Sequence, residues 1–528
     1  MSTSSAIEPL RSPVFRMLWL AWLAANLTMW ANDVAAAWLM TTLTDSALMV
    51  ALVQAASTLP VFLLGLPSGA LADIIDRKRF LAATQVWVAL IALVLCALAL
   101  ADGLSAPLLL ALTFLNGIGM AMRWPVFSAI VPELVPRTQL GPAIALNGVA
   151  MNLSRVLGPI IAGSLLAGAG PAAVFALNAA LAVFSFTLIT RWKSPRPVRT
   201  LPGERFLAAM RVGLQHVMQT PRLRVILLRV FMFFLASTAM TALMPLVARR
   251  LGAGAGGFTL LLAATGCGAV FAALVIMPRI RDRVPRDRIV WICTLVHAAC
   301  SVTVAVVPAL WMAVPVAMVA GMAWMSCANT LTVSAQMALP DWVRARGMSI
   351  YQMGLMGGSA AGAALWGQVA GMTSVPTGLF AAAACGPLVL LFTRHLRIGD
   401  VSSLDHTPVH PGVDPNPAIR FDPDAGPVMV TVEYLIDPAQ AQEFVAVMQR
   451  TRQARLRQGA LSWGLFRDIE QDGRYIEYFL DESWIEHLRR LQRFTADDLQ
   501  LRERRLAFHR GDAPPKVQRY VASEPADG

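Results

Sequence analysis

Long apolar segments recur between residues 15 and 396, and they restrict the possible folds of this chain more than any other feature. A helix that crosses a bilayer needs about 20 mostly apolar residues, because each residue adds about 1.5 Å across an apolar layer about 30 Å thick. Twelve segments meet this requirement, near residues 15–40, 47–71, 80–101, 106–128, 140–168, 171–191, 224–248, 257–278, 288–307, 310–334, 347–371 and 376–396. The sequence therefore predicts an all-α membrane protein with 12 transmembrane helices.

The composition excludes an ordinary soluble protein. Hydrophobic residues make up 56% of the 528 residues and charged residues only 14%, whereas an average soluble domain is about 25% charged. Residues 1–419 hold 28 Lys and Arg against 14 Asp and Glu, and residues 420–528 hold 16 against 18. Because the positive excess lies in the apolar part, it indicates membrane topology, and we expect no nucleic-acid partner.

The basic residues of the loops predict the orientation. With the N-terminus inside, the cytoplasmic loops before the C-terminal tail carry 21 Lys and Arg, and the opposite side carries only Arg249 and Arg250. Positive loops are retained in the cytoplasm during insertion. We therefore expect both termini in the cytoplasm. The polar residues 1–13 precede a first apolar segment without a clean cleavage site, so we expect a retained helix and no signal peptide.

Two loop motifs occur twice, about 209 residues apart. Gly69 to Arg79 is repeated in Pro278 to Arg288, and Pro132 to Arg137 is repeated in Pro340 to Arg344. Duplicated six-helix halves are the internal symmetry of one large class of transporters. We expect halves at about 10–192 and 222–397, joined by a basic cytoplasmic loop. The repeated loop contains the candidate gating residues Gly69, Asp73, Arg77, Lys78, Arg79, Asp282 and Arg286.

These motifs resemble the major facilitator superfamily (MFS) over about residues 10–397. The stretch from Gly69 to Arg79 is similar to the family's signature between spans two and three, which implies a gating role. Gly158, Pro159 and Gly163 are similar to the Gly-Pro motif of its drug antiporters, where the glycines allow close helix packing and the proline favours a bend. The loop at Pro132 to Arg137 resembles the branch of siderophore exporters and macrolide efflux proteins. The resemblance implies a multi-pass protein of the bacterial inner membrane.

Charged residues at membrane depth are costly, so each one is a functional candidate. Asp33 in span one and Arg155 in span five lie at comparable depths. We hypothesise that Asp33 is the proton-coupling residue and that Arg155 is its counter-charge or a substrate anchor. The alternative is a static polar pair that positions helices. Arg123, near the cytoplasmic end of span four, is a third intramembrane charge, unless it only snorkels to the surface.

Further polar and aromatic side chains in the spans are candidates for a substrate cavity. They are Asn26, Trp30, Gln54, Asn152, Asn329 and Gln352, and Trp324 and Gln368 lie on the same candidate helices. Such residues more often form hydrogen bonds between helices. All six cysteines fall in apolar segments without metal-ligand spacing, so we expect neither disulfide nor metal. No Walker-type loop is present, so we expect neither ATP nor another cofactor.

The C-terminal part has a different pattern. Residues 398–427 are rich in Pro, Asp and Gly and predict a linker. Strands are expected at 428–436, 461–469, 474–480 and 516–522, and helices at 438–457, 483–493 and 496–507, with a hairpin turn at Asp472-Gly473. This β-α-β-β-α-β order predicts an α+β, ferredoxin-like domain over 428–523, on the cytoplasmic side.

Tyr475 to Leu480 and Ser483 to Leu488 resemble the dimeric α/β-barrel proteins related to antibiotic-biosynthesis monooxygenases. The resemblance implies a homodimer formed through this domain, and some relatives are cofactor-free enzymes. His487 is the candidate for catalysis, but we expect it on a helix surface without such a role. Dimerisation or ligand sensing is the favoured function of the domain.

The leading functional hypothesis is a non-enzymatic, proton-coupled exporter of an amphiphilic small molecule such as a drug, siderophore or secondary metabolite. Its expected partners are the lipid bilayer, the substrate and the proton gradient. An importer of the same fold is one alternative, and a transporter fused to a monooxygenase-like enzyme is another.

Overall fold

The structure is a computed structural model, and it describes residues 8–74, 76–136, 139–192, 206–280, 283–399, 407, 409, 419 and 421–522. The chain divides into two compact units. The helical unit comprises residues 1–201, 226–333 and 349–399, and the second unit comprises residues 202–225, 334–348 and 400–528. The predicted linker at 398–427 lies mostly outside the described residues.

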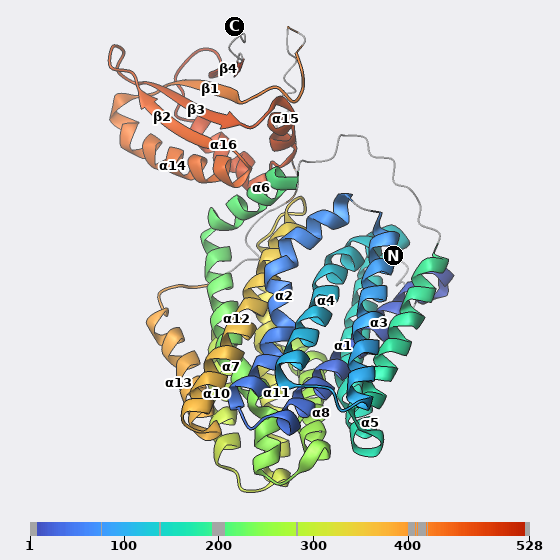
Figure 1. Cartoon of the computed structure of the whole chain (residues 1–528). Coiled ribbons are helices and arrows are strands. Elements are labelled where there is room, and N and C mark those ends of the chain that lie inside the picture. Colours follow the sequence, from blue (N-terminus) through green and yellow to red (C-terminus); the bar gives the residue numbers. More distant parts are fainter. Residues whose placement is uncertain are drawn as a thin grey trace. The chain divides into compact units, whose positions relative to one another are not determined.

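Long helices make up the helical unit (Figure 1). A short 3-10 helix, η1 (Glu8–Arg11), comes first, and Ser12 caps the helix that follows. The long helices are α1 (Pro13–Leu43), α2 (Ala47–Ile74), α3 (Arg77–Leu100), α4 (Ala106–Leu134), α5 (Leu140–Arg191), α7 (Pro221–Arg250), α8 (Gly254–Phe271), α10 (Arg286–Val306), α11 (Leu310–Met337), α12 (Arg344–Met372) and α13 (Val375–Phe392). A π-helical turn, η3 (Ala272–Ile276), and α9 (Met277–Ile280) extend α8.

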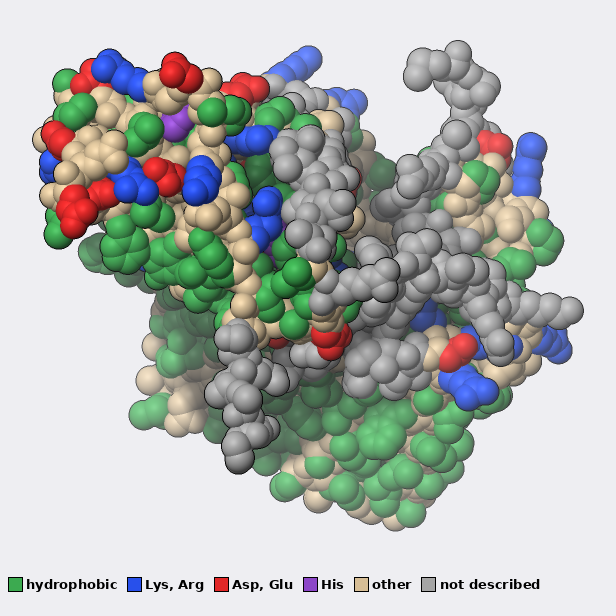
Figure 2. Space-filling view, turned by 90° about the horizontal axis from the view of Figure 1, so that it is seen from above, with side chains coloured by type: hydrophobic (Ala, Val, Ile, Leu, Met, Phe, Trp, Pro, Cys, Tyr) green, Lys and Arg blue, Asp and Glu red, His purple; other side chains and the backbone are tan. Residues whose placement is uncertain are grey.

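Ten helical segments of the described residues are long and apolar enough to cross a membrane. The predicted spans at 140–168 and 171–191 are joined in α5, which has 52 residues and leaves helical geometry at Gly170 (φ 78°, ψ −180°). The predicted span at 347–371 is formed as α12, which is not among the ten. The surface over the helices is largely apolar (Figure 2), with exposed side chains such as Leu63, Leu93 and Phe392.

Close packing explains why α12 is rich in glycine. A Cβ atom on Gly358 would lie 2.4 Å from the carbonyl oxygen of Phe231 in α7, and one on Gly357 would lie 2.7 Å from the Phe62 ring in α2. Small residues let helix backbones approach each other in this way. The glycines of α12 thus bring a helix of the second half against both halves of the bundle, and they also dilute the hydropathy that identifies a span.

The two halves share a buried apolar core at one end of the bundle. This core, which we call the shared core, contains residues of α1, α2, α3, α4 and α5 of the first half and of α7, α8, α10, α11, α12 and α13 of the second. It lies towards the end that carries the α1–α2 turn, residues 44–46. A second cluster, around Phe15, Phe80 and Phe127, draws residues only from the first half. Buried apolar contact therefore joins the halves at the end that carries residues 44–46.

The second unit contains a four-stranded sheet. The strands are β1 (Val428–Leu435), β2 (Ser462–Arg467), β3 (Arg474–Asp481) and β4 (Lys516–Val521), in the spatial order β2-β3-β1-β4, and every neighbouring pair is antiparallel. The helices are η4 (Pro438–Gln440), α14 (Ala441–Arg457), α15 (Trp484–Gln492) and α16 (Ala496–Leu506). Each element lies within two residues of its predicted range. The expected order of strands and helices is therefore the observed one.

The helices cover one face of this sheet (Figure 1). Burial alternates along β1 and β3, so that Val430, Tyr434 and Phe479 point into a core with Phe444 and Met448 of α14. The alternate residues point to the other face, which is partly exposed. Apolar side chains and Thr431 occupy most of that face, and charged or polar side chains lie at its margins: the former are Met429, Thr431, Leu435, Phe466, Ile476, Tyr478, Leu480 and Tyr520, and the latter are Glu433, Ser462, Arg474, Lys516 and Gln518.

The basic loop between the halves contains a helix that the sequence analysis did not predict. This helix, α6 (Phe206–Met218), packs on the sheet domain within the second unit. Arg211 forms an ion pair with Glu482, and the side-chain amide of Gln215 donates to the carbonyl of Ala460 (3.3 Å). His216 meets the ring of Trp342, which precedes α12, edge to face (5.3 Å). The loop prediction is thus corrected, because one side of this segment is a packing surface.

Candidate functional site

An arginine stacked on tryptophan links the two halves inside the helical unit. The guanidinium carbon of Arg155, on α5, lies 4.0 Å from the ring centre of Trp324, on α11, and 5.6 Å from that of Trp30, on α1. A desolvated cation over an indole ring is stabilised by about 2 kcal/mol. The structure therefore brings together one predicted charge and two predicted cavity aromatics from both halves.

Gly158 explains how Arg155 and Trp30 come together. A Cβ atom on Gly158 would lie 2.5 Å from the Cβ atom of Trp30, so α1 and α5 touch at this level. Arg155 is three residues earlier, on the same side of α5, because residues three apart share a helix face. The glycine of the predicted motif therefore sets the position of the arginine relative to α1.

Asp33 lies one turn beyond Trp30 and is partly exposed. In the described part of the chain, neither Asp33 nor Arg155 takes part in an ion pair or a side-chain hydrogen bond, and they do not bond to each other. The carboxyl group of Asp33 and the guanidinium group of Arg155 thus lie on neighbouring helices, and the guanidinium group is held by the rings of Trp30 and Trp324. The hypothesis that they exchange charge during transport stays a prediction.

The amides proposed for the cavity are in two situations. Asn26 is buried and donates to the carbonyl of Trp22 (2.8 Å), and Asn152 donates to that of Gly148 (2.9 Å). Both bonds lie within one helix, so these two amides have structural partners. Gln54, Asn329 and Gln352 are partly exposed on α2, α11 and α12. A role of Gln54, Asn329 and Gln352 in a substrate cavity stays a prediction.

Arg123 is buried in the first half, away from the Arg155 site. Its guanidinium carbon lies 5.6 Å from the ring centre of Trp22, and its Nε atom has no hydrogen-bond partner among the described residues. A snorkelling side chain would reach the surface. The observed burial does not fit that alternative.

The gating motif can be followed only in part. Gly69 and the backbone of Asp73 lie in α2, whereas the Asp73 side chain and all of Asp282 lie outside the described part of the chain. At the start of α3, which carries Arg77, Lys78 and Arg79, the carboxylate of Asp76 accepts from the backbone N–H of Arg79 (2.9 Å) and caps the helix. Arg286 begins α10. The gating role of these residues stays a prediction.

Gly163 of the predicted bend motif lies at the contact between halves. A Cβ atom there would lie 2.0 Å from the hydroxyl oxygen of Thr259 on α8. The backbone of α5 keeps helical dihedral angles through Pro159 and leaves them only at Gly170. The close packing expected of Gly158 and Gly163 is therefore present, and a bend caused by Pro159 stays a prediction.

A polar contact that the sequence analysis did not identify lies at the shared-core end. Arg249, at the end of α7, donates to the carboxylate of Asp45 (2.8 Å) and to the carbonyl of Thr41 (3.2 Å). Arg249 and Asp45 border a cavity of about 570 Å³, which is also lined by Trp38, Leu43 and Gly254. The sequence analysis expected only two basic residues on the outer side of the membrane, and Arg249 is one of them. That rarity could have marked Arg249 as a residue with a specific partner.

Residues 4–526 match the family model described as transmembrane secretion effector. The chain belongs to this MFS-type family. The staphyloferrin A transporter of Staphylococcus aureus is 28% identical over 139 residues, which are 26% of this chain and 35% of the relative. Macrolide efflux protein A of Streptococcus pyogenes is 24% identical over 236 residues, which are 44% of this chain and 58% of the relative. The chain thus matches less than two thirds of the length of these curated relatives.

Solved transporters share the fold of the helical part of this chain. A bacterial homologue of the human lysosomal transporter Spinster, crystallised in an inward-facing and unoccupied conformation, superposes with a TM-score of 0.58 at 15% identity, covering 74% of this chain and 97% of its own. A D-xylose–proton symporter superposes with a TM-score of 0.56 at 16% identity, covering 74% and 98%. At these identities the likeness shows a helical transporter fold and nothing about the substrate.

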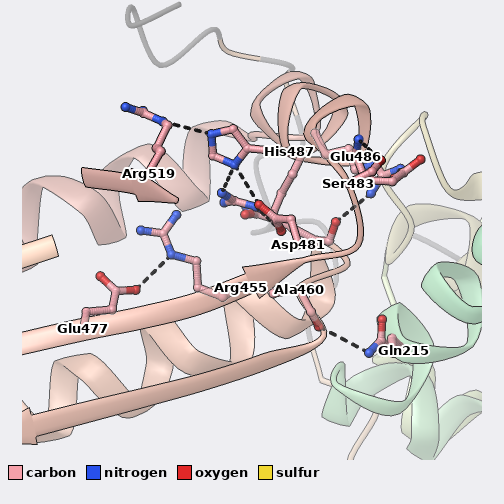
Figure 3. A network of polar contacts seen from close by, with 12 residues as sticks. Gln215, Arg455, Ala460, Glu477, Asp481, Ser483, Glu486, His487 and Arg519 are labelled. Carbon is pink, nitrogen blue, oxygen red and sulfur yellow. Dashed lines mark hydrogen bonds and ion pairs between the residues drawn. The ribbon is translucent and has the colours of Figure 1, made fainter. Parts of the chain in front are cut away.

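The sheet domain contains a second polar site, where the surface position expected for His487 is wrong. His487 is only 1% exposed. Its Nδ1 atom lies 2.7 Å from the carboxylate of Asp481, and Arg519 donates to its Nε2 atom (3.1 Å), as Figure 3 shows. Burial is the main cause that lowers the pKa of His487, so the ring is neutral near pH 7.

Glu477 is the second buried acid of this unit. Its carboxylate accepts from Arg455 (3.0 Å), Trp463 (3.0 Å) and the hydroxyl of Tyr434 (3.0 Å). Burial alone would raise the pKa of Glu477, but the charges of Arg455 and Arg505 and the hydrogen bonds lower it to about 2. The acid is therefore ionised at any physiological pH.

Proposed function

We propose that the chain is a secondary active exporter that moves a small amphiphilic molecule by alternating access and is coupled to protons. The observation that carries the proposal is the contact of Arg155 with Trp324, which joins the two halves beside the partly exposed Asp33. Protonation of an acid at that position would change the charge next to the inter-half contact. Such a change is what coupling of helix rearrangement to a proton gradient requires.

We also propose that the helical unit has twelve spans in two six-helix halves. Counting α5 as two spans that meet at Gly170, and adding α12 to the segments that are apolar enough, supports this number. The bias of 21 to two basic residues then supports both termini in the cytoplasm of a bacterial inner membrane. The end closed by the shared core would be the outer end, so the structure corresponds to an inward-facing state.

The residues near Arg155 suggest the substrate class. Trp30 and Trp324 offer flat apolar surfaces, Arg155 offers a cation, and partly exposed amides on α2, α11 and α12 offer hydrogen bonds. This combination suits a molecule with an apolar body and a polar or acidic group. The names of the relatives, a staphyloferrin A transporter and macrolide efflux proteins, agree with a small-molecule cargo, and the second name favours export.

Transport into proteoliposomes under an imposed pH gradient tests the proposal, with a macrolide and staphyloferrin A as probes. We expect accumulation in the export direction, and we expect Asp33→Asn to reduce gradient-driven transport at least tenfold, about 1.4 kcal/mol or more. Asp45→Asn is the matched control, because Asp45 is 90% exposed in the α1–α2 turn. Undiminished gradient-driven transport by Asp33→Asn would refute proton coupling at Asp33, and accumulation only in the opposite direction would identify an importer.

For the soluble part, we propose a ferredoxin-like domain over residues 428–523 that follows a linker at 398–427 and pairs with a second copy through its open sheet face. Phe466 on that face is exposed and stacked on Tyr478 (5.6 Å). The aromatic and aliphatic side chains of this face favour burial against a similar face, and Glu433 and Arg474 at its edge are already paired with each other. Phe466→Glu should shift the full-length protein in detergent from dimer to monomer by light scattering, whereas Ile469→Glu in the fully exposed hairpin turn should not. A monomeric wild type would rule out the dimer.

A further inference from the structure

Two small cavities lie between α7, α10 and α13 of the second half. Each has a volume of about 10 Å³, and Phe233, Thr294 and Gly386 line both of them. The cavities are therefore adjoining parts of one cleft, which we call the second-half cleft. The polar and charged side chains that line it are Arg229, Ser237, Thr294, His297, Ser301 and Thr393.

The second-half cleft runs along the helices from one end of the bundle. It starts at Thr393, the residue that directly follows α13, and it extends along α10 from Val290 to Ser301. A helix rises about 1.5 Å per residue, so the stretch from Val290 to Ser301 is about 16 Å long. That length is about half of an apolar layer about 30 Å thick. The cleft therefore reaches from the end of α13 to the middle of the spanning helices.

His297 lies at the deep end of this cleft and is 7% exposed. Its ring meets the ring of Phe233 edge to face, with 6.1 Å between the ring centres. In the described part of the chain, neither nitrogen of the His297 ring takes part in a hydrogen bond. A neutral imidazole carries one donor and one acceptor, and leaving both without a partner inside a protein is costly. The side chains around the ring therefore do not satisfy it by themselves.

Ser237, on α7, is a second unsatisfied group of the cleft. It is 2% exposed, and its hydroxyl has no hydrogen-bond partner among the described residues. The hydroxyls of Thr294 and Ser301 donate to carbonyls of their own helix, at 2.8 and 3.0 Å, and each still has a lone pair that can accept. A buried water needs about 10–15 Å³ of space and two to four polar partners. The second-half cleft meets both requirements.

His297 is the residue of this lining whose charge can change near neutral pH. Of the residues that line the two cavities, only Arg229 and His297 are ionisable. Arg229 donates to the hydroxyl of Thr393 (2.6 Å) and to the carbonyls of Thr393 (2.8 Å) and Leu396 (3.0 Å), so its charge is held at the end of α13. The other ionisable side chains of α7, α10, α11 and α13 are charged residues in the first and last turns and the thiols of Cys293, Cys300, Cys327 and Cys385.

We propose that the second-half cleft holds water and that His297 takes up a proton from this water. The proton passes from hydronium in the cleft to the free ring nitrogen, which becomes the second N–H of an imidazolium, and it leaves by the reverse step. Histidine is the side chain whose charge ordinarily changes near neutral pH, and ionisable residues inside a membrane mark proton pathways. In the proposed topology the Thr393 end is cytoplasmic, so the cleft connects His297 with the cytoplasm.

In transport, His297 would act as a second proton-binding residue in addition to Asp33, and this role rests on the proposed proton coupling. A new charge between α7, α10 and α13 favours more water in the cleft and therefore a wider spacing of these helices. Uptake and release of the proton would thus change how α7 packs. Because α7 contributes to the shared core, the change would reach the contact between the halves.

Solid-state NMR tests the water and the proton. The full-length protein in lipid vesicles is labelled with ¹⁵N in histidine and ¹³C in phenylalanine. The His297 signals are assigned by their contact with the Phe233 ring and by their loss in His297→Gln. We expect magnetisation to pass from water protons to the His297 ring nitrogens, and we expect these signals to change from the neutral to the charged form between about pH 8 and pH 4. Absence of transfer from water, or signals of the neutral form over this whole range, would overturn the proposal.

Ser237→Ala tests whether the water lies where the cavities place it. The variant removes one partner of the water and adds no bulk, so the transfer from water to His297 should fall severalfold. Ser164→Ala is the matched control, because Ser164 is exposed on α5 and donates within its own helix (2.9 Å). It should leave the transfer unchanged. Wild-type transfer in Ser237→Ala would overturn the water site.

His297→Gln tests the role in transport, because glutamine forms hydrogen bonds but takes up no proton near neutral pH. In proteoliposomes we expect gradient-driven transport to fall severalfold. Counterflow of the transported probe, macrolide or staphyloferrin A, needs no gradient and should keep its wild-type rate. This pattern separates the loss of a proton site from damage to the fold. His395→Gln, at an exposed position just after α13, is the matched control and should transport as the wild type does.

The outcomes separate His297 from proton coupling as such. If the wild type ignores the pH gradient, proton coupling fails, and the NMR measurements by themselves support or overturn proton uptake by His297. If Asp33→Asn loses gradient-driven transport and His297→Gln keeps it, proton coupling stands and the role of His297 in transport is overturned. Equal loss of counterflow and gradient-driven transport in His297→Gln would also overturn that role, because the histidine would then only hold helices together. If His297→Gln does not fold, the wild-type NMR measurements decide.

Discussion

Glu477 shows at the level of one residue how a buried charge can contribute to stability over nearly the whole pH range. Its pKa falls from an ordinary 4.5 to about 2 in the folded domain. A carboxyl with a lowered pKa stabilises the fold fully above its unfolded pKa and loses that contribution as the pH falls through its folded pKa. The contribution of about 3 kcal/mol should therefore be present above pH 4.5 and disappear between pH 4.5 and 2.

Arg455 should be indispensable as long as Glu477 is charged. Arg455→Met leaves the carboxylate buried without its main partner, and we expect a loss of about 3–5 kcal/mol in the stability of the soluble domain. The double variant Arg455→Met with Glu477→Leu should recover most of this loss, because both charges are then removed. Exchange of β1 and β3 amides in the full-length protein measures both. Equal destabilisation by the single and double variants would contradict this account.

The buried histidine site shows what the sequence did not reveal about single residues. The pattern of α15 placed His487 on a helix but did not identify its neighbours, because Asp481 ends β3 and Arg519 lies on β4. In the same way, the depths of Asp33 and Arg155 followed from counting along the spans. The rotation of each helix, which turns Arg155 towards Trp324, depends on packing between the halves.

At the level of elements, α5 is the helix on which both packing and transport should depend. Gly158 lets α5 pack closely against α1, and Gly163 lets it pack closely against α8 of the second half. The same helix carries Arg155 between these two contacts. A rearrangement of the halves therefore has to separate α5 from α8 at Gly163, where the fit leaves no room for a side chain.

Gly163→Val should block the closed arrangement of the halves at this end. Its Cβ atom would lie 2.0 Å from the Thr259 hydroxyl, and overpacking of this kind costs about 1–3 kcal/mol. We expect transport in proteoliposomes to fall about tenfold or more. Gly168→Val is the control, because no atom lies within 4 Å of a Cβ atom there. Equal transport rates of the two variants would show that this contact does not change during transport.

The elements themselves were largely predictable, for physical reasons. The length of the apolar segments identified the helices of the first unit. The alternation of apolar and polar residues, together with the Asp472-Gly473 turn, predicted the ends of the strands and helices in the sheet domain to within two residues. One feature escaped. The sequence analysis interpreted residues 192–222 only as a basic loop and therefore missed α6. The four-residue spacing of Val212 and His216, which are both buried, could have indicated a helix with one buried face.

For the whole molecule, apolar packing and not the ion pair accounts for closure at the shared-core end. Asp45 and Arg249 are exposed by 90% and 51%, and exposed pairs of this kind contribute about 0–1 kcal/mol. The shared core buries side chains from eleven helices, and each fully buried apolar side chain contributes about 1.5–3 kcal/mol. The ion pair therefore orients the α1–α2 turn, while the free energy of closure comes from the apolar residues. Because the exposed Asp45–Arg249 pair contributes so little free energy, Asp45→Asn should leave closure unchanged, and it therefore serves as a control for Asp33→Asn.

The connection between the halves should be ordered by the soluble domain. In α6, Val212 is 2% exposed and packs near Gly459, whereas Leu214 is 50% exposed. Val212→Asp places an unpaired charge in this contact at a cost of several kcal/mol. The Arg211–Glu482 pair, whose side chains are 36% and 31% exposed, cannot offset this cost. We expect exchange of the α6 amides in the full-length protein to rise at least tenfold, whereas Leu214→Asp should leave it unchanged. If both variants leave α6 protected, then α6 is held by contacts other than those with the sheet domain.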